Sequence, residues 1–113
     1  MLTIYHNPRC AKSRQGVAFL EENKQDFETV LYLKDNLNKE ELTTLIEQLG
    51  VVPEALVRKT EKIWKETFKG KELSDQEIID AMVAHPKLIE RPIVSNGTKA
   101  VIGRPTESIQ TVL

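Results

Sequence analysis

Hydrophobic and polar positions along the chain predict strands near both ends and helices between them. Residues 2–5 form a short β-prone run, and the turn-forming residues 6–8 close it. Residues 10–22 follow with an apolar group at 17–20, which predicts a helix. A second β-prone run at 29–33 then predicts a βαβ unit with two parallel strands.

The middle of the chain is predicted to be helical. Between residues 42 and 49, apolar side chains recur at helical spacing, and Asn38 with Glu41 forms a capping-box pattern ahead of them. Gly50 follows at the position where a helix commonly ends. We therefore expect a well-defined helix to begin after Asn38 and to end before Gly50.

Two more helices are expected before the next strand. Pro53 is suited to the first turn of a helix that would run through residue 64. Ser74 and Glu77 form a second capping-box pattern before the apolar positions in 78–83. His85 precedes a proline, so we expect it to end this helix rather than to take part in chemistry.

The C-terminal part predicts a hairpin and a short helix. Two β-prone runs, 92–94 and 100–102, flank the pair Asn96-Gly97, which suits the positive φ angles of a hairpin turn. Residues 105 and 106 can then start a terminal helix that runs towards residue 112. The order is βαβ, helices, ββα. It predicts an α/β fold with the mixed sheet of a thioredoxin-like protein, residues 1–113 forming one domain and residues 38–84 a helical insertion.

Composition excludes several functional classes. The chain has 113 residues and a formal net charge of −1, with no long run of like charge, so no broad nucleic-acid surface is expected. No apolar stretch reaches the length of a membrane span, and the N-terminus lacks the layout of a signal peptide, so we expect a cytoplasmic protein without a membrane anchor. A lone cysteine excludes an internal disulfide and a cysteine-rich zinc site, and no metal or bound cofactor is expected.

The candidate chemistry lies in the loop that leads into the first helix. Cys10 stands at the predicted helix start, with the basic residues Arg9, Lys12 and Arg14 around it and no acid nearby. Helix N–H groups and neighbouring cations stabilise a thiolate, and the same groups can hold a bound oxyanion. This loop therefore predicts attack by Cys10 on a tetrahedral oxyanion such as arsenate.

Several roles in this loop remain open from the residues alone. Ser13 stands where a Cys-x-x-Cys site would have its second thiol, so a reductant must come from another molecule. Cys10 could instead be a small buried apolar residue. His6 could tune the thiol or only fix the turn, and Arg14 could face the anion or lie on the exposed face of the helix.

Four ordered segments extend this picture across nearly the whole chain. They are residues 5–10 with Ser13-Arg14, then residues 56–59, 90–94 and 102–105. In these segments the chain resembles the arsenate reductases that work with glutathione and glutaredoxin, a thioredoxin-fold family that includes Spx-type regulators. The resemblance implies that Cys10 is the nucleophile, that Arg58, Arg91 and Arg104 bind the arsenate oxyanion, and that His6 influences the thiol. It also implies a cis peptide bond before Pro92.

The resemblance implies a reaction as well as a site. Cys10 would form a thiol-arsenate adduct, glutathione as co-substrate would release arsenite, and glutaredoxin would reset the thiol. Ala11-Lys12 and Gln15 depart from the family's Cys-Gly-Thr-Ser-Arg-Asn loop, which bears on substrate preference. The alternatives are a glutathione-linked thiol oxidoreductase with another substrate, and an Spx-like regulator that binds RNA polymerase through the inserted helices. Ser13 argues against the regulator, because a Cys-x-x-Cys switch would need a second thiol there.

Overall fold

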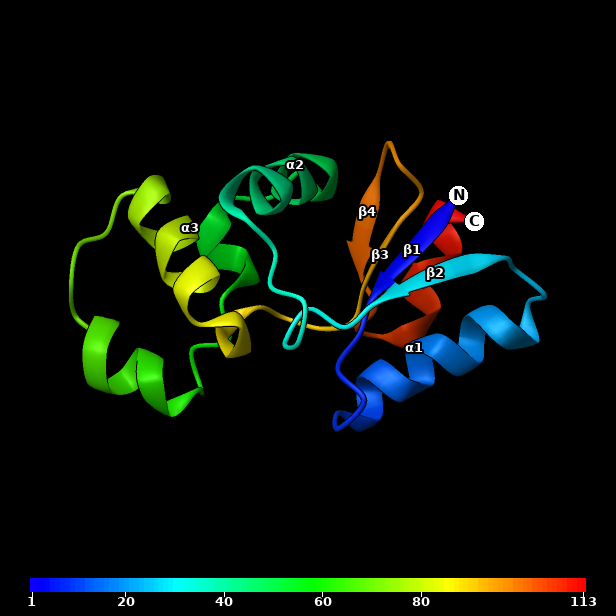
Figure 1. Ribbon diagram of the computed structural model, residues 1–113, viewed down its shortest axis with the longest axis horizontal. Coiled ribbons are helices and arrows are strands. Elements are labelled where there is room, and N and C mark those ends of the chain that lie inside the picture. The colour runs from blue at the N-terminus through cyan, green and yellow to red at the C-terminus, as the bar shows by residue number, and fades with distance from the viewer.

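A four-stranded mixed sheet organises the chain in the computed structural model, which describes all residues from 1 to 113 (Figure 1). The strands are β1 (Leu2–Tyr5), β2 (Phe27–Val30), β3 (Ile93–Ser95) and β4 (Ala100–Ile102). Their order in the sheet is β2-β1-β3-β4, with β1 and β2 parallel and the other neighbours antiparallel. The predicted α/β fold with a thioredoxin-like mixed sheet is therefore confirmed.

Helices lie on the sheet and beside it. The helices α1 (Ala11–Glu22) and η4 (Thr106–Val112) share one face of the sheet. Between β2 and β3 the chain forms the other helical elements, which place the helical segment to one side of the sheet (Figure 1). These are α2 (Lys39–Leu49), η1 (Pro53–Leu56), η2 (Trp64–Phe68), α3 (Asp75–Ala84) and η3 (Pro86–Leu88). None of the helices is long and apolar enough to cross a membrane.

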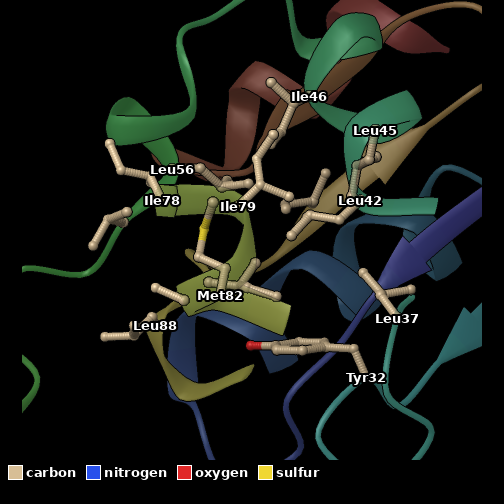
Figure 2. Close-up of a cluster of buried hydrophobic side chains, with 14 of the residues drawn as sticks. Tyr32, Leu37, Leu42, Leu45, Ile46, Leu56, Ile78, Ile79, Met82 and Leu88 are labelled. Atoms are coloured by element: carbon tan, nitrogen blue, oxygen red, sulfur yellow. The ribbon is translucent and has the colours of Figure 1, made fainter. Parts of the chain in front are cut away.

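The alternation of side chains along the strands divides the core into two clusters. Ile4 and Val94 point to the face covered by α1 and η4, whereas Ile93 packs with the helical segment. Figure 2 shows the larger cluster, in which Tyr32 lies below apolar side chains of α2 and α3. Full burial of one such Leu or Ile side chain contributes about 1.5–3 kcal/mol, so this cluster joins the helices firmly to the sheet.

The predicted caps of the two long inserted helices are confirmed. At α2, the Asn38 side chain accepts a hydrogen bond of 2.8 Å from the Glu41 backbone N–H, and the Glu41 carboxylate accepts one from Asn38. Ser74 and Glu77 form the same reciprocal pair at α3. Gly50 ends α2 at a φ of 67°, a left-handed conformation that favours glycine.

The second strand begins and ends earlier than the sequence pattern predicts. The prediction was 29–33, but β2 covers Phe27–Val30. Its parallel partner β1 ends at Tyr5, where the turn towards the cysteine begins, so pairing stops at Val30. The chain then turns, with the backbone N–H of Lys34 donating to the Leu31 carbonyl.

The predicted continuous helix from Pro53 through residue 64 is wrong. A short 3-10 turn, η1, ends at Leu56, and Val57 is extended and forms an isolated β-bridge with Ile89. Two backbone hydrogen bonds hold this bridge, Arg58 N–H to the Leu88 carbonyl at 2.7 Å and Glu90 N–H to the Leu56 carbonyl at 2.9 Å. Long-range pairing thus overrides the helical pattern, and it brings Arg58 beside Glu90.

The hairpin and the terminal helix form as predicted, with differences in detail. In the turn only Gly97 has a positive φ, because the Asn96 side chain accepts hydrogen bonds from the backbone of Thr98 and Lys99 and fixes the turn locally. The helix η4 is a 3-10 helix. The peptide bond before Pro92 is cis, as expected, and the bond before Pro105 is also cis.

Candidate thiol and arginine site

The loop between β1 and α1 is held by hydrogen bonds that converge on Ser13. The buried Ser13 hydroxyl accepts a bond of 2.9 Å from the Asn7 backbone N–H and forms a bond of 2.6 Å with Nδ1 of His6. The Asn7 side-chain oxygen accepts a hydrogen bond from the Arg9 backbone N–H, and the Asn7 backbone carbonyl accepts one from the Cys10 N–H, both at 3.0 Å. These bonds fix Cys10 as the residue immediately before α1.

His6 and Arg14 therefore both have contacts within the loop. Partial burial and the nearby Arg14 charge lower the pKa of His6, which favours its neutral form at neutral pH. Arg14 is exposed, and its Nη1 donates a bond of 2.8 Å to the Pro8 carbonyl. For His6 the contact with Ser13 corresponds to the reading in which it fixes the turn, and for Arg14 the exposure corresponds to the reading in which it lies on the exposed face of the helix. The predicted roles of both residues towards thiol and anion stay predictions.

Cys10 is partly exposed and lies against cationic groups. Nη2 of Arg104 donates to its Sγ at 3.6 Å. The pKa of the Cys10 thiol is lowered: burial is the largest single influence and raises it, but other groups together outweigh burial. These are the backbone N–H groups of Ser13 and Lys12 and the Arg91 guanidinium. The thiol thus has the setting of a nucleophile rather than of an inert apolar residue.

Close packing around Pro92 brings this thiol and two arginines together. Arg91 and Pro92 lead into β3, and Gly103 and Arg104 follow β4, which pairs with it. A Cβ added at Gly16 in α1 or at Gly103 would lie only 2.9 Å from the Cγ of Pro92. The two glycines therefore allow α1 and the hairpin to approach Pro92 closely, which sets Arg91 and Arg104 beside the start of α1.

The third predicted arginine, Arg58, comes from the helical segment and contacts the acid that precedes Arg91. Arg58 follows the β-bridge described above, and its Nη1 donates to Oε1 of Glu90 at 2.8 Å. Its Nε lies 3.7 Å from Oε2 of Glu61. Arg58 is thus held by two carboxylates, and no direct contact joins it to Cys10.

Glu90 links the three arginines, and sequence reasoning missed it. One of its carboxylate oxygens, Oε1, accepts from the Arg58 guanidinium, and it lies 3.2 Å from Nε of Arg104. The same oxygen accepts from the Arg91 backbone N–H at 3.1 Å. Arg104 is held a second time, because its Nε donates to the Arg91 carbonyl at 2.8 Å. The only local signal was an acid directly before Arg91.

Tyr32 is a second residue that sequence reasoning missed. It is buried, and burial is the main cause that raises the pKa of its hydroxyl to about 12. The charges of Arg91, Cys10, Arg58 and Glu90 act on the same pKa with smaller effects. Three buried side-chain polar atoms in the chain have no hydrogen-bond partner within it: the Tyr32 hydroxyl, Nε of Arg58 and Nε of Arg91. All three can donate, and the two arginines belong to the cluster around Glu90. Nε of Arg58 faces the Glu61 carboxylate, so the Tyr32 hydroxyl and Nε of Arg91 are the unused donors of the kind that an oxyanion accepts.

Three further observations concern the site and its surroundings. A cavity of about 700 Å³ adjoins the loop, between residues 6–9, the segment after β2 and residues 86 and 87. Arg9, Lys34 and Lys87 contribute its charged groups, and no carboxylate lines it. No group of three or more His, Cys, Asp or Glu side chains is placed to hold a metal ion. His85 ends α3, as predicted from its place before Pro86.

Comparisons with known proteins show which family the chain belongs to. The model of the ArsC family matches residues 5–112. An uncharacterised Escherichia coli protein, YfgD, is 43% identical over 112 residues, covering 97% of this chain and 94% of that protein. An arsenate reductase of Haemophilus influenzae is 38% identical, with 97% of each chain covered.

A solved structure gives the same result in three dimensions. The structure of an arsenate reductase from Vibrio cholerae superimposes with a TM-score of 0.95 at 42% identity, covering 99% of this chain and 97% of that one. The match includes both the sheet and the helical segment, because it extends over almost all residues. The chain that brings Cys10 and the arginines together in this way belongs to the ArsC family.

Proposed function

We propose that this chain is an oxidoreductase that reduces arsenate to arsenite through Cys10, with glutathione and glutaredoxin as its reductants. The observation that carries the proposal is the contact between the Cys10 thiol and Arg104, within a cluster of arginines that has unused donors. Relatives named arsenate reductase at 37% and 38% identity support the same activity. The reductants are the finer part of the proposal.

In the first step the Cys10 thiolate attacks arsenic. A sulfur–arsenic bond forms, one arsenic–oxygen bond breaks, and the departing oxygen leaves as water after it takes up protons. Arsenic remains at oxidation state five in this adduct. The Arg91 and Arg104 guanidinium groups stabilise the charge on the remaining oxygens. Such stabilisation by fixed donors is usually the largest single contribution to lowering the barrier of a step of this kind.

In the second step a glutathione thiolate attacks the Cys10 sulfur. A disulfide forms between Cys10 and glutathione, and the electron pair of the sulfur–arsenic bond goes to arsenic, which leaves as arsenite. The two thiols thus supply the two electrons. Glutaredoxin then attacks the glutathione sulfur and frees Cys10 for the next cycle.

The cavity beside the loop supports a small anionic thiol as the reductant. Its volume of about 700 Å³ lies within the range of small-molecule sites. Its charged lining consists of cations, and the two carboxylates of glutathione would be attracted to Arg9, Lys34 and Lys87. We therefore place glutathione there in this proposal, with its thiol directed towards Cys10.

The test is NADPH oxidation that depends on arsenate, measured with glutathione, glutaredoxin and glutathione reductase. The purified chain should support steady turnover, and the Cys10→Ser variant should lose it, because a serine hydroxyl is far less acidic than this thiol. Arsenite should accumulate in step with the NADPH consumed.

Two outcomes would contradict the proposal in different ways. If neither protein turns over arsenate, the activity is wrong, and a glutathione-linked oxidoreductase with another substrate takes its place. If turnover occurs with thioredoxin in place of glutathione and glutaredoxin, arsenate reduction holds but the reductants are wrong.

Lys87→Glu, which inverts one charge of the cavity, should raise the KM for glutathione and leave the KM for arsenate unchanged.

A further inference from the structure

Glu90 is an acid at the centre of a cluster that should attract anions. Its Oε1 is 2.8 Å from Nη1 of Arg58 and 3.2 Å from Nε of Arg104. Its side chain is 24% exposed and that of Arg58 is 17% exposed, so these charges are partly shielded from water. Ion pairs of this kind are stronger than those on an open surface, and their charges act on anything that binds beside them.

The carboxylate occupies donors that an oxyanion would otherwise use. Arg58 has its terminal Nη1 bound to Glu90, and the fork it could offer to a tetrahedral anion is therefore partly engaged. Arg104 is engaged through Nε only, so its terminal nitrogens stay available, and Nη2 contacts Cys10. The remaining donors thus come mainly from Arg91 and Arg104.

Among the three arginines and their direct partners, the charges balance when the thiol is ionised. Three arginines face two carboxylates, Glu90 and Glu61, and the Cys10 thiolate. Tyr32 lies close to the same charges and stays neutral, whereas Arg9, Lys12 and Arg14 belong to the loop side of Cys10. A multiply charged anion that enters beside the thiolate therefore meets arginines whose charge is already largely offset.

We propose that Glu90 is a specificity-determining residue, an internal carboxylate that engages Arg58 and Arg104 and thereby limits the affinity of the site for multiply charged oxyanions. The anion that binds best is then one of low charge that uses Arg91 and the free end of Arg104. The proposal concerns the same site as the proposed function, and it rests on that function only for the identity of the oxyanion.

The test compares the wild-type chain with Glu90→Gln, which removes the charge and keeps an acceptor oxygen for the arginines. Cys10 is alkylated with neutral iodoacetamide over a range of pH, and inorganic sulfate is used as the protecting anion. In the variant, the half-protecting sulfate concentration should fall about 5- to 10-fold, as expected when one nearby like charge is removed. The apparent pKa of Cys10 should fall by about 0.5–1 unit, because the Arg104 charge is no longer offset.

Glu61→Gln is the matched control. Glu61 lies near Nε of Arg58 and has no contact with Arg104, so its loss should change sulfate protection less and leave the Cys10 titration in place. Equal effects of the two variants would overturn the proposal, since a general change in charge would then explain both. Unchanged or weaker sulfate protection in Glu90→Gln would also overturn it.

The readouts separate this proposal from the proposed function. Alkylation and sulfate protection need no arsenate, so a chain that fails to reduce arsenate still reports on Glu90. Thermal unfolding of each variant establishes that the fold is intact. If Glu90→Gln does not fold, Glu90→Asn also removes the charge on a shorter side chain, and the same two shifts are expected from it.

Discussion

The two halves of the site are held together by different kinds of interaction. The loop around Cys10 depends mainly on hydrogen bonds between uncharged groups, with the buried Ser13 hydroxyl at their centre, and its one charged donor is the exposed Arg14. The arginine half depends on charged contacts to one carboxylate, Glu90, and its side chains are partly exposed. Cys10 is thus placed by interactions that salt affects little, whereas Arg58 and Arg104 are placed by interactions that salt and charge changes affect directly.

This difference indicates how the work is divided within one small site. The loop must hold the sulfur at the start of α1, where backbone N–H groups act on it whatever the solvent contains. Under the proposed function, the arginines exchange part of their contact with Glu90 for a bound anion, and such charged contacts respond to salt and to changes of charge. Each half should therefore respond to a different perturbation.

The largest expected effect is on the arginine half. In Arg104→Lys, one ammonium group replaces a fork that contacts Glu90, the Arg91 carbonyl and the Cys10 sulfur. The charge is kept but the paired geometry is lost, so we expect kcat/KM for arsenate to fall about 100-fold. The free energy of unfolding, measured with urea, should change by less than about 1 kcal/mol.

A matched substitution identifies the cause of that loss. Lys59→Arg is the control. Lys59 forms an exposed ion pair with Glu54 and contacts neither Glu90 nor the thiol, so this substitution should leave kcat/KM for arsenate unchanged. Wild-type activity in Arg104→Lys would contradict a role for the fork and would assign oxyanion binding to the other two arginines.

A smaller effect, on stability, is expected in the loop half. Ser13→Ala removes the acceptor of the buried Asn7 N–H and the partner of His6. An unpaired buried donor costs about 1–3 kcal/mol, and we expect the free energy of unfolding to fall by that amount in urea denaturation. The loss should be the same at low and high salt. A loss that shrinks as salt is added would show that charge, not the neutral hydrogen bonds, holds the loop.

The smallest expected effect separates the two influences on the thiol. Because the thiolate is the reactive form and the pKa of Cys10 is lowered, its alkylation rate should reach a plateau at lower pH than that of a free cysteine. Salt shortens the Debye length from about 30 Å at 0.01 M to about 3 Å at 1 M, so it weakens the influence of Arg91 and Arg104. The apparent pKa should then rise by a few tenths of a unit and still remain below that of free cysteine, owing to the backbone N–H groups.

Either extreme in that titration would break the comparison. A pKa that returns fully to the free-cysteine value at high salt would assign the whole effect to the arginines. A pKa that does not move with salt would assign it to the backbone N–H groups of Lys12 and Ser13. Mass spectrometry of the intact chain gives the alkylated fraction of Cys10 directly, because Cys10 is the only thiol in the chain.

Local patterns predicted the elements whose boundaries depend on nearby residues. The capping pairs before α2 and α3 lie within three residues of each other, so the sequence displays them directly. The position of Cys10 at the start of α1 is of the same kind, because the turn and the helix adjoin it. These features needed no knowledge of distant contacts.

Features set by distant contacts could not be predicted in this way. The pairing of Val57 with Ile89 interrupts the expected helix and places Arg58 beside Glu90, although the two residues are 32 positions apart. The close approach of Gly16 to Pro92 likewise depends on the packing of α1 against the hairpin. The resemblance supplied the three arginines and included Glu90 in one of its segments, but neither it nor the pattern gave this carboxylate a role.

The buried serine also fixes the kinetic order of any cycle at Cys10. Ser13 occupies the position from which a second sulfur would resolve an adduct, and its hydroxyl is already bound to His6 and Asn7. Under the proposed function, the breakdown of an adduct on Cys10 is therefore a bimolecular step, whose rate depends on the concentration of thiols in the surroundings and not on a rearrangement within the chain. If the proposed function holds, the protein responds to the thiol supply of its environment and stalls in the modified form when that supply runs out.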